Sequence, residues 1–162
     1  YLRKEKNTIL TIDLRGHGNS EGRLNELKEQ DFINMSLDIK AAYEYLKSQE
    51  IYEISIIGAS IGANAAINFA AEEKSLKSLI LLSPGIEYRG IKTERAIRKY
   101  YGPLLILVGK NDKYSYDSSE RLFKISPSSS KLESYETSNH GTELILKTAG
   151  VKELIKDWLG NN

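Results

Sequence analysis

The sequence predicts an α/β fold: a doubly wound, mostly parallel sheet flanked by helices. Strand-like and helix-like segments alternate along the chain, the pattern of consecutive β-α-β units. The most apolar run, Leu104–Val108, is continuous instead of alternating, as expected for a parallel strand covered on both faces. A β-branched run also ends in a G-x-S-x-G pattern at 58–62, typical of a sharp strand-to-helix turn. We expect residues 1–162 to form a single domain of this kind.

The first half of the chain supplies two predicted strands and two predicted helices. Thr8–Asp13 is a short apolar strand that ends in a loop with two glycines. A helix begins at about Asp31, because apolar residues then recur at i, i+3 and i+4 spacing. Its apolar residues are Phe32, Met35, Ile39, Ala42, Tyr43 and Leu46. Tyr52–Ile57 is the next strand, and a helix rich in alanine follows the turn at 58–62.

The second half continues the alternation. Leu79–Leu82 is a buried strand stopped by a Ser-Pro-Gly turn, and Thr93–Tyr100 is a short helix. Asp117 begins a capping-box pattern that opens a helix through Ile125. Leu132–Tyr135 is a weaker edge strand, and Thr142–Leu159 is the last helix. The residues expected on the inward face of that helix are Ile145, Leu146, Ala149, Leu154, Ile155 and Trp158.

Composition excludes several classes of function. Lys and Arg total 23 against 22 for Asp and Glu, so charge gives no reason to expect nucleic acid or an anionic membrane as a partner. The absence of cysteine excludes a disulfide framework, a thiolate metal site and a cysteine nucleophile. Two histidines far apart in the sequence form no metal-binding pattern, so we expect no metal or cofactor. No apolar run approaches the ~20 residues of a membrane span.

Ser60 is the candidate nucleophile. The turn forces its backbone into a strained conformation, and Gly58 and Gly62 carry no Cβ where strand and helix pass closely. The amide of Ile61 lies in the first turn of the following helix, where it is available to stabilise an oxyanion. The alternative interpretation is a glycine turn with a serine helix cap.

Two further residues stand where chemistry is expected in a parallel sheet. Ligands bind outside the carboxyl ends of such strands, and Asp112 and His140 each follow a strand, as Ser60 does. A serine nucleophile needs a base, and the base needs a carboxylate to fix its tautomer. Serine, histidine and aspartate supply those three roles. Asp112 also fits a plain turn, because Asn-Asp after a strand is a common turn former.

Other residues compete for these roles. His17, the second histidine, is better interpreted as a polar loop residue than as the base. Asp117 is expected to serve as a helix cap, which leaves Asp112 better placed as the acid. Glu136 and Glu143 flank His140 and could pair with it. The tyrosines that could line a pocket, although surface turns fit them equally well, are Tyr88, Tyr100, Tyr101, Tyr114 and Tyr116.

The chain resembles the α/β-hydrolase superfamily, in its single-domain serine esterase and lipase-like branch. Four motifs match in the order of that family: residues 13–20, the G-x-S-x-G turn, residues 103–112, and His140 with the glycine after it. The resemblance implies Ser60 as nucleophile, Asp112 as acid, His140 as base and the Ile61 amide as oxyanion donor. It further implies hydrolysis of a small-molecule carboxylic ester through an acyl-enzyme, without a cofactor. A peptidase or acyltransferase of the same fold, or a decayed binding module, are the alternatives.

One departure from the family pattern concerns the oxyanion site. Members of the family have a further strand whose loop gives a second oxyanion amide, and nothing in this sequence corresponds to it. That strand lies between the Thr8–Asp13 strand and the strand before Ser60, so its loss interrupts the centre of the sheet. Because the chain also begins with Tyr1 and not Met, we expect a fragment of a longer protein, whose compartment and oligomeric state these residues do not reveal. Only residues 83–102 separate two core strands, which predicts an open site without a lid.

Overall fold

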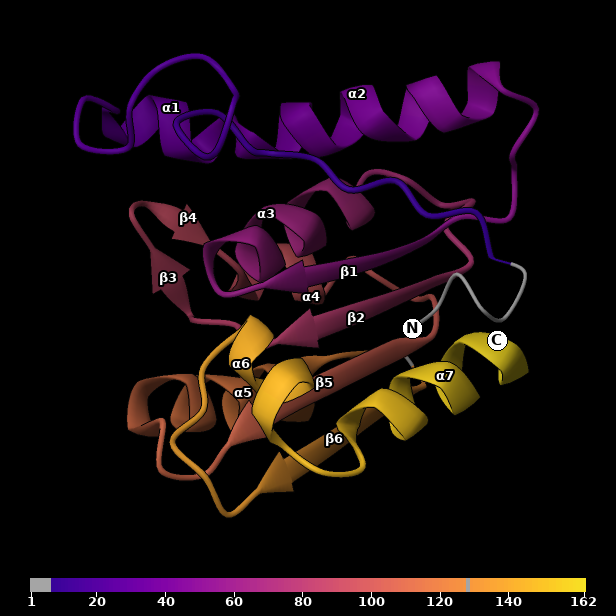
Figure 1. Cartoon of the computed structure of the whole chain (residues 1–162). Coiled ribbons are helices and arrows are strands. Elements are labelled where there is room, and N and C mark those ends of the chain that lie inside the picture. Colours follow the sequence, from indigo (N-terminus) through magenta and orange to yellow (C-terminus); the bar gives the residue numbers. More distant parts are fainter. Residues whose placement is uncertain (1–6, 128) are drawn as a thin grey trace.

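A four-stranded sheet forms the centre of the protein, in a computed structural model that describes residues 7–127 and 129–162 (Figure 1). The strands lie in the order β1-β2-β5-β6, and each neighbouring pair is parallel. Their bounds are Ser55–Ala59 for β1, Ser78–Leu82 for β2, Leu104–Gly109 for β5 and Ser130–Tyr135 for β6. All four strands therefore end at the same edge of the sheet.

Helices and a small hairpin connect these strands. The helices are α1 (Glu29–Ile33), α2 (Met35–Ser48), α3 (Ile61–Ala70), α4 (Glu94–Ile97), α5 (Lys113–Ile125), α6 (Thr142–Lys147) and α7 (Val151–Asn161). Strands β3 (Glu87–Tyr88) and β4 (Ile91–Lys92) pair antiparallel as a hairpin between β2 and α4. No helix of the described residues is long and apolar enough to cross a membrane.

Both faces of the sheet are covered. On one face Leu79 and Ile106 pack in a core with side chains of α2, α3, α4 and α5. On the other, Ile80 and Leu105 pack with residues of α6 and α7. Consecutive strand residues point to opposite faces, so burial on both sides requires the continuous apolar runs seen in the sequence. The predicted doubly wound parallel sheet is confirmed.

The predicted Thr8–Asp13 strand is wrong. The segment is extended but belongs to no sheet, and about 40% of the surface of Ile9 and of Ile12 is exposed. Figure 1 shows its indigo trace running alongside α2. A strand needs the backbone of a neighbouring strand to pair with. Within the described residues β1 pairs only with β2, so the Thr8–Asp13 segment does not pair with β1. Strand propensity without such a partner leaves an extended segment.

Two predicted helices are each divided into two. The first is interrupted at Asn34, between α1 and α2. The last is interrupted at Gly150, whose φ of +81° is in the left-handed region that glycine tolerates. This break changes which side chains face inward: Leu146 is 71% exposed and Ala149 is exposed as well, so both were wrongly placed in the core. Leu144 takes the buried position in α6.

The predicted start of the next-to-last helical region is also wrong. Helix α5 begins at Lys113, four residues before Asp117, and Asp112 occupies the position in front of it. Asp117 lies inside α5, where its carboxylate pairs with Lys113 one turn away at 2.6 Å. Asp117 is therefore no helix cap. The capping-box pattern was misleading because an i, i+4 ion pair uses the same acidic residue type.

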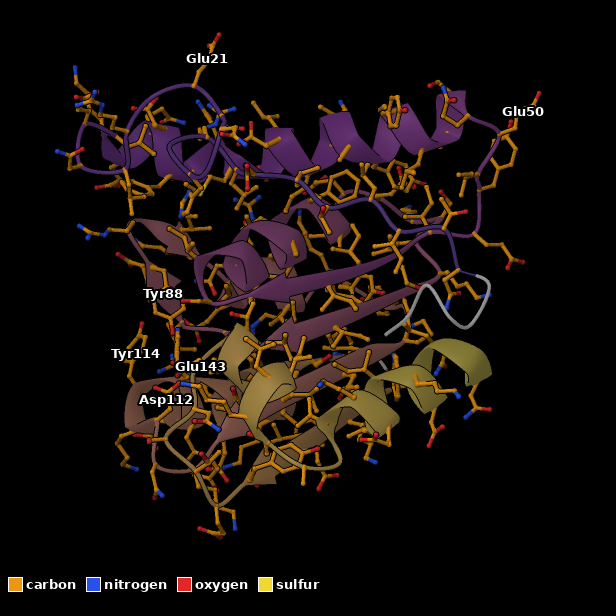
Figure 2. All side chains as sticks on the ribbon, viewed as in Figure 1. Glu21, Glu50, Tyr88, Asp112, Tyr114 and Glu143 are labelled. Carbon is orange, nitrogen blue, oxygen red and sulfur yellow. The ribbon has the colours of Figure 1, made fainter. Side chains whose placement is uncertain are left out.

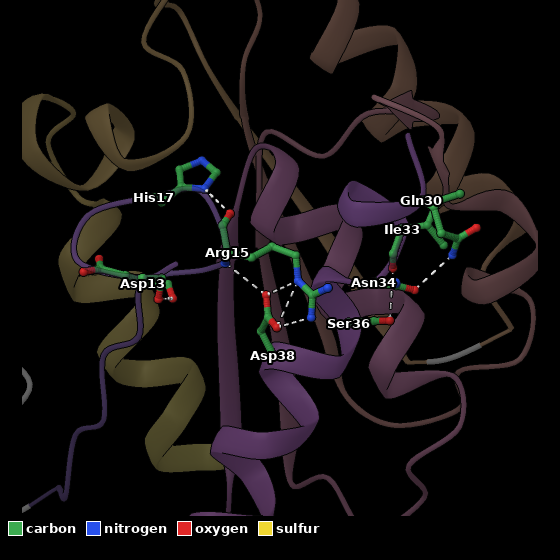
Figure 3. Close-up of polar contacts among 9 residues, drawn as sticks. Asp13, Arg15, His17, Gln30, Ile33, Asn34, Ser36 and Asp38 are labelled. Carbon is green, nitrogen blue, oxygen red and sulfur yellow. Dashed lines mark hydrogen bonds and ion pairs between the residues drawn. The ribbon is translucent and has the colours of Figure 1, made fainter. Parts of the chain in front are cut away.

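An ion pair attaches the glycine loop after Asp13 to α2 (Figure 3). The Arg15 side chain donates from Nε to Asp38 Oδ2 at 3.0 Å and from Nη2 to Oδ1 at 2.5 Å, and its backbone amide donates to Oδ2 at 3.0 Å. Burial opposes the charge of Asp38, but the hydrogen bonds and charge of Arg15 together hold the pKa of this carboxyl below its usual value. The bidentate geometry fixes where the loop lies.

We expect Asp38→Asn to lower the free energy of unfolding at pH 7 by about 1–3 kcal/mol. Because the native pKa of Asp38 is depressed, its stabilisation is complete above the ordinary value of 3.8 and is lost as the pH falls through the native pKa. Urea denaturation at pH 7 and pH 3 measures this, and the difference from wild type should shrink at pH 3. Glu53→Gln, which breaks the exposed pair with Lys77, is the control and should destabilise the protein much less, because solvent screens that pair. Equal losses in the two variants would contradict this account.

Candidate active site

Ser60 occupies a strained turn between β1 and α3. Its φ of +53° and ψ of −123° lie where a residue with a side chain is rarely found. The turn is held by hydrogen bonds on both sides: the Ser60 amide donates to the Leu82 carbonyl at 2.8 Å, and the Ala63 amide donates to the Ser60 carbonyl at 2.9 Å. A strained backbone persists when its surroundings fix it in this way, and such strain is common at functional sites.

The glycines on either side of Ser60 differ in importance. A Cβ on Gly58 would lie 2.6 Å from the carbonyl oxygen of Gly62 and 2.8 Å from the Cα of Ala63, so only glycine fits there. A Cβ on Gly62 would meet just the Leu14 side chain at 3.8 Å, an ordinary contact. The expectation of close strand–helix passage is confirmed at Gly58 and wrong at Gly62.

The three predicted site residues form one hydrogen-bonded chain. His140 Nε2 lies 2.7 Å from Ser60 Oγ, and His140 Nδ1 lies 2.6 Å from Asp112 Oδ2. Ser60 follows β1, Asp112 follows β5, and His140 comes after β6. Parallel strands carry all three to the same edge of the sheet, although 80 residues separate Ser60 from His140 in the sequence. The His140 side chain is 40% exposed and that of Asp112 17%.

The position of Asp112 explains why its carboxylate is available to His140. An aspartate directly before a helix usually accepts a hydrogen bond from an amide of the first turn, but Asp112 makes no such bond to α5. Its carboxylate instead accepts from His140. The amino-terminal end of α5 favours a negative charge there, because the helix dipole is positive at that end.

The loop that carries His140 is attached to the end of β2 by Ser83, a residue that is not among those predicted from the sequence. Ser83 is fully buried, and its Oγ accepts a hydrogen bond from the Gly141 amide at 3.0 Å. Gly141 has a φ of +56° and packs close to Ser60, with a notional Cβ 3.7 Å from that of Ser60. Ser83 directly follows an apolar strand at the same sheet edge, and that placement was the available signal.

The competing residues are engaged elsewhere. His17 Nδ1 contacts the carbonyl oxygen of Arg15 at 3.1 Å in the glycine loop. Glu136 pairs with Lys110, and Glu143 pairs with Lys147, whose hydrogen bond lowers the pKa of the Glu143 carboxyl. Figure 2 shows Asp112 and Glu143 in the same region, at the end of the strands. The carboxylate bonded to the His140 imidazole is that of Asp112.

The tyrosines proposed as pocket residues have different surroundings. Tyr100 is buried in the core, whereas Tyr101 is largely exposed. Tyr88 lies edge-on to the His140 ring, with the ring centres 6.4 Å apart, and Tyr114 packs against Tyr88. Figure 2 shows Tyr88, Tyr114 and Asp112 at the same end of the molecule. The ring of Tyr88 thus packs against the ring of His140, a predicted site residue.

Ile61 is the first residue of α3, so its amide has no acceptor within the helix. The amino-terminal end of α3 therefore offers a donor and a positive dipole end beside Ser60. A hollow of about 840 Å³ lies elsewhere. Its lining includes Leu10, Arg15 and Tyr45, and none of the three bonded residues lines it. Within the described ranges, no group of three His, Cys, Asp or Glu side chains could hold a metal ion.

Comparison with known families supports the fold and adds a classification. The family model of serine aminopeptidase S33 matches residues 1–102. The chain belongs to this S33 family, within the α/β-hydrolase superfamily. The match contains Ser60 and Ile61 and ends before Asp112 and His140, so the S33 assignment depends on the amino-terminal part of the chain. A search of curated proteins finds no significant match.

Solved structures share the fold of this S33 family member. Est1E from Butyrivibrio proteoclasticus, solved with ferulic acid bound, superposes with a TM-score of 0.71 at 23% identity, over 91% of this chain and 76% of that one. Dienelactone hydrolase from Anabaena variabilis gives 0.71 at 19% identity, over 86% and 64%. Esterase Pf2001 from Pyrococcus furiosus gives 0.72 at 21%, over 92% and 68%. The chain thus spans about two thirds to three quarters of their lengths.

Replacing each of the two glycines by alanine tests whether close contact between β1 and α3 requires glycine at that position. We expect Gly58→Ala to lower the free energy of unfolding by at least about 2 kcal/mol, because the new methyl group collides with backbone atoms of α3. Gly62→Ala should be neutral or stabilising by up to about 1 kcal/mol, because alanine is the better helix former. Thermal and urea denaturation of both variants measure this. Similar destabilisation in both would contradict the packing described.

Proposed function

We propose that the protein is a serine hydrolase that cleaves a carboxylic ester of a small molecule through an acyl-enzyme intermediate. The observation that supports this most directly is the unbroken chain from Ser60 Oγ through His140 to Asp112, with contacts of 2.7 and 2.6 Å. Contacts of this length are the geometry in which a base removes the proton of a nucleophile. In this proposal Ser60 is the nucleophile and His140 is the general base. Asp112 is the acidic residue of the three, whose carboxylate orients His140.

In the first half of the reaction, Ser60 Oγ attacks the ester carbonyl carbon while His140 Nε2 accepts the hydroxyl proton. The carbonyl oxygen becomes an oxyanion, and the Ile61 amide donates a hydrogen bond to it. Asp112 accepts from His140 Nδ1 and stabilises the imidazolium. His140 then returns the proton to the alcohol oxygen as the ester bond breaks, which leaves the acyl group on Ser60.

In the second half, water takes the place of the alcohol. His140 removes a proton from the water as it attacks the acyl carbon, then returns a proton to Ser60 Oγ as the acid leaves. The Ile61 amide is the oxyanion donor that we assign. Loss of one such donor typically costs about 10²–10³ in turnover, so we expect slow hydrolysis by this chain compared with an enzyme that has two.

An ester substrate is favoured over an amide by two considerations. The alkoxy or aryloxy group of an ester leaves more readily than the amino group of an amide, so an ester makes less demand on a site with one assigned oxyanion donor. The fold is also shared with a protein described as an esterase, Pf2001 from Pyrococcus furiosus, although at 21% identity this likeness concerns the fold alone. Peptide hydrolysis is the second candidate, because the matching family is described as a serine aminopeptidase.

Hydrolysis of p-nitrophenyl acetate and of an aminoacyl p-nitroanilide by the chain tests the proposal. We expect turnover of the ester that exceeds turnover of the anilide. Ser60→Ala and His140→Ala should each lower kcat by about 10³-fold or more, because the remaining groups cannot activate a nucleophile. His17→Ala, at the other histidine, should stay within about threefold of wild type.

Two results would count against the assignment. Faster cleavage of the anilide would favour the peptidase. Ester hydrolysis that survives both Ser60→Ala and His140→Ala would show that another group performs the reaction.

A further inference from the structure

A second set of hydrogen bonds encloses His140 from the side away from Ser60. Ser115, in the first turn of α5, is fully buried, and its Oγ lies 3.4 Å from His140 Nδ1. The same Oγ lies 3.0 Å from the hydroxyl of Tyr88, in strand β3. The Tyr88 hydroxyl donates to the Ser83 carbonyl at 3.3 Å. Because that proton is used, Ser115 donates to Tyr88 and turns a lone pair towards His140 Nδ1. The single Nδ1 proton is donated to Asp112 at 2.6 Å, so the Ser115 contact at 3.4 Å is the weaker arm of a shared hydrogen bond.

These contacts form a closed circuit of hydrogen bonds that starts at His140 and returns to the next residue of the same loop, Gly141. From the His140 ring it passes through Ser115 and Tyr88 to the Ser83 carbonyl. Ser83 returns to the loop because its Oγ accepts from the Gly141 amide. The circuit therefore restrains both the imidazole of His140 and the backbone next to it.

The ring of Tyr88 has little freedom to leave this arrangement. A Cβ on Gly85 would lie 2.8 Å from two carbons of the Tyr88 ring, so the ring packs directly on the bare backbone. The backbone of Gly85 is itself fixed: its amide donates to Asn64 Oδ1 at 3.0 Å, and its carbonyl accepts from Thr93 Oγ1 at 2.8 Å. Burial also raises the pKa of the Tyr88 hydroxyl, which therefore remains a donor.

We propose that Tyr88, acting through Ser115, is a positioning residue that fixes the orientation of the His140 imidazole, and that the β3–β4 hairpin thereby contributes to the reaction. The kinetic part of this inference depends on the proposed function. The physical reason is rotation: one strong bond from Nδ1 to Asp112 leaves the ring able to tilt, and a small tilt moves Nε2 away from Ser60 Oγ. A second contact at Nδ1 and the edge of the Tyr88 ring oppose that tilt.

Tyr114 provides a matched control. It belongs to α5, packs against Tyr88, and holds the same hairpin by accepting from the Glu87 amide at 3.1 Å and donating to the Glu87 carbonyl at 2.7 Å. Its hydroxyl thus fastens the hairpin without joining the circuit at His140. Tyr114→Phe weakens the attachment of the hairpin, whereas Tyr88→Phe removes the hydroxyl that orients Ser115.

The test is NMR of the protein with ¹⁵N-labelled histidine, in wild type and in Tyr88→Phe, Ser115→Ala and Tyr114→Phe. The chain has two histidines, so His17 is an internal reference. We expect the Nδ1 proton of His140 to exchange with solvent about three- to tenfold faster in Tyr88→Phe and Ser115→Ala, the effect of losing one hydrogen bond. Tyr114→Phe should match wild type, and His17 should be unchanged throughout. In the double variant of Tyr88→Phe and Ser115→Ala, the Nδ1 proton should exchange no faster than in either single variant, because both substitutions remove the same contact.

An unchanged His140 signal in Tyr88→Phe and Ser115→Ala would overturn the inference, as would equal changes in Tyr88→Phe and Tyr114→Phe. With p-nitrophenyl acetate, Tyr88→Phe should lower kcat about three- to tenfold and leave KM near wild type. A rise in KM alone would show that Tyr88 contacts substrate and does not position His140. Absence of turnover in wild type would contradict the proposed function, while the NMR result would still decide the positioning role.

Discussion

The close contact between β1 and α3 at Gly58 is the constraint on which the site depends. Because backbone atoms of Gly62 and Ala63 occupy the space that a Cβ would need, α3 must begin immediately after the strand ends. The chain can make that turn only if Ser60 accepts a positive φ, and the hydrogen bond to Leu82 holds it there. In this turn Ser60 Oγ lies 2.7 Å from His140 Nε2. A site built on this turn is rigid before any substrate arrives, which is the condition for efficient use of a serine hydroxyl.

The parallel sheet converts distant sequence positions into neighbours. Leu82, Gly109 and Tyr135 end three adjacent strands, and the loops after them carry Ser83, Asp112 and His140. The core on both faces keeps these strands in register, since their side chains alternate between the two layers. The site therefore depends on side chains such as Leu81 and Leu107, which take no part in the chemistry proposed for it.

Features that depend on a short stretch of sequence could be predicted from local patterns. The turn at Ser60, the apolar strand before Asp112 and the chain order of the candidate residues are all readable in the sequence, and the structure brings the three side chains into contact. Ser83 and Ser115 could not be recognised in the same way, because their environments arise only when separate loops meet. The Thr8–Asp13 segment failed for a related reason: an apolar run predicts a strand, but only a neighbouring backbone makes one. Asp117 shows that one acidic residue fits two local roles, a helix cap and an i, i+4 ion pair.

The central claim is that the contacts among Ser60, His140 and Asp112 make one serine of this chain nucleophilic. Intact-protein and peptide mass spectrometry after exposure to a fluorophosphonate measures this directly, because the probe bonds covalently to an activated serine. The account predicts a single adduct on Ser60 that disappears in Ser60→Ala and forms much more slowly in His140→Ala and Asp112→Asn. An adduct on another serine, or labelling of Ser60 at an unchanged rate in His140→Ala, would contradict it.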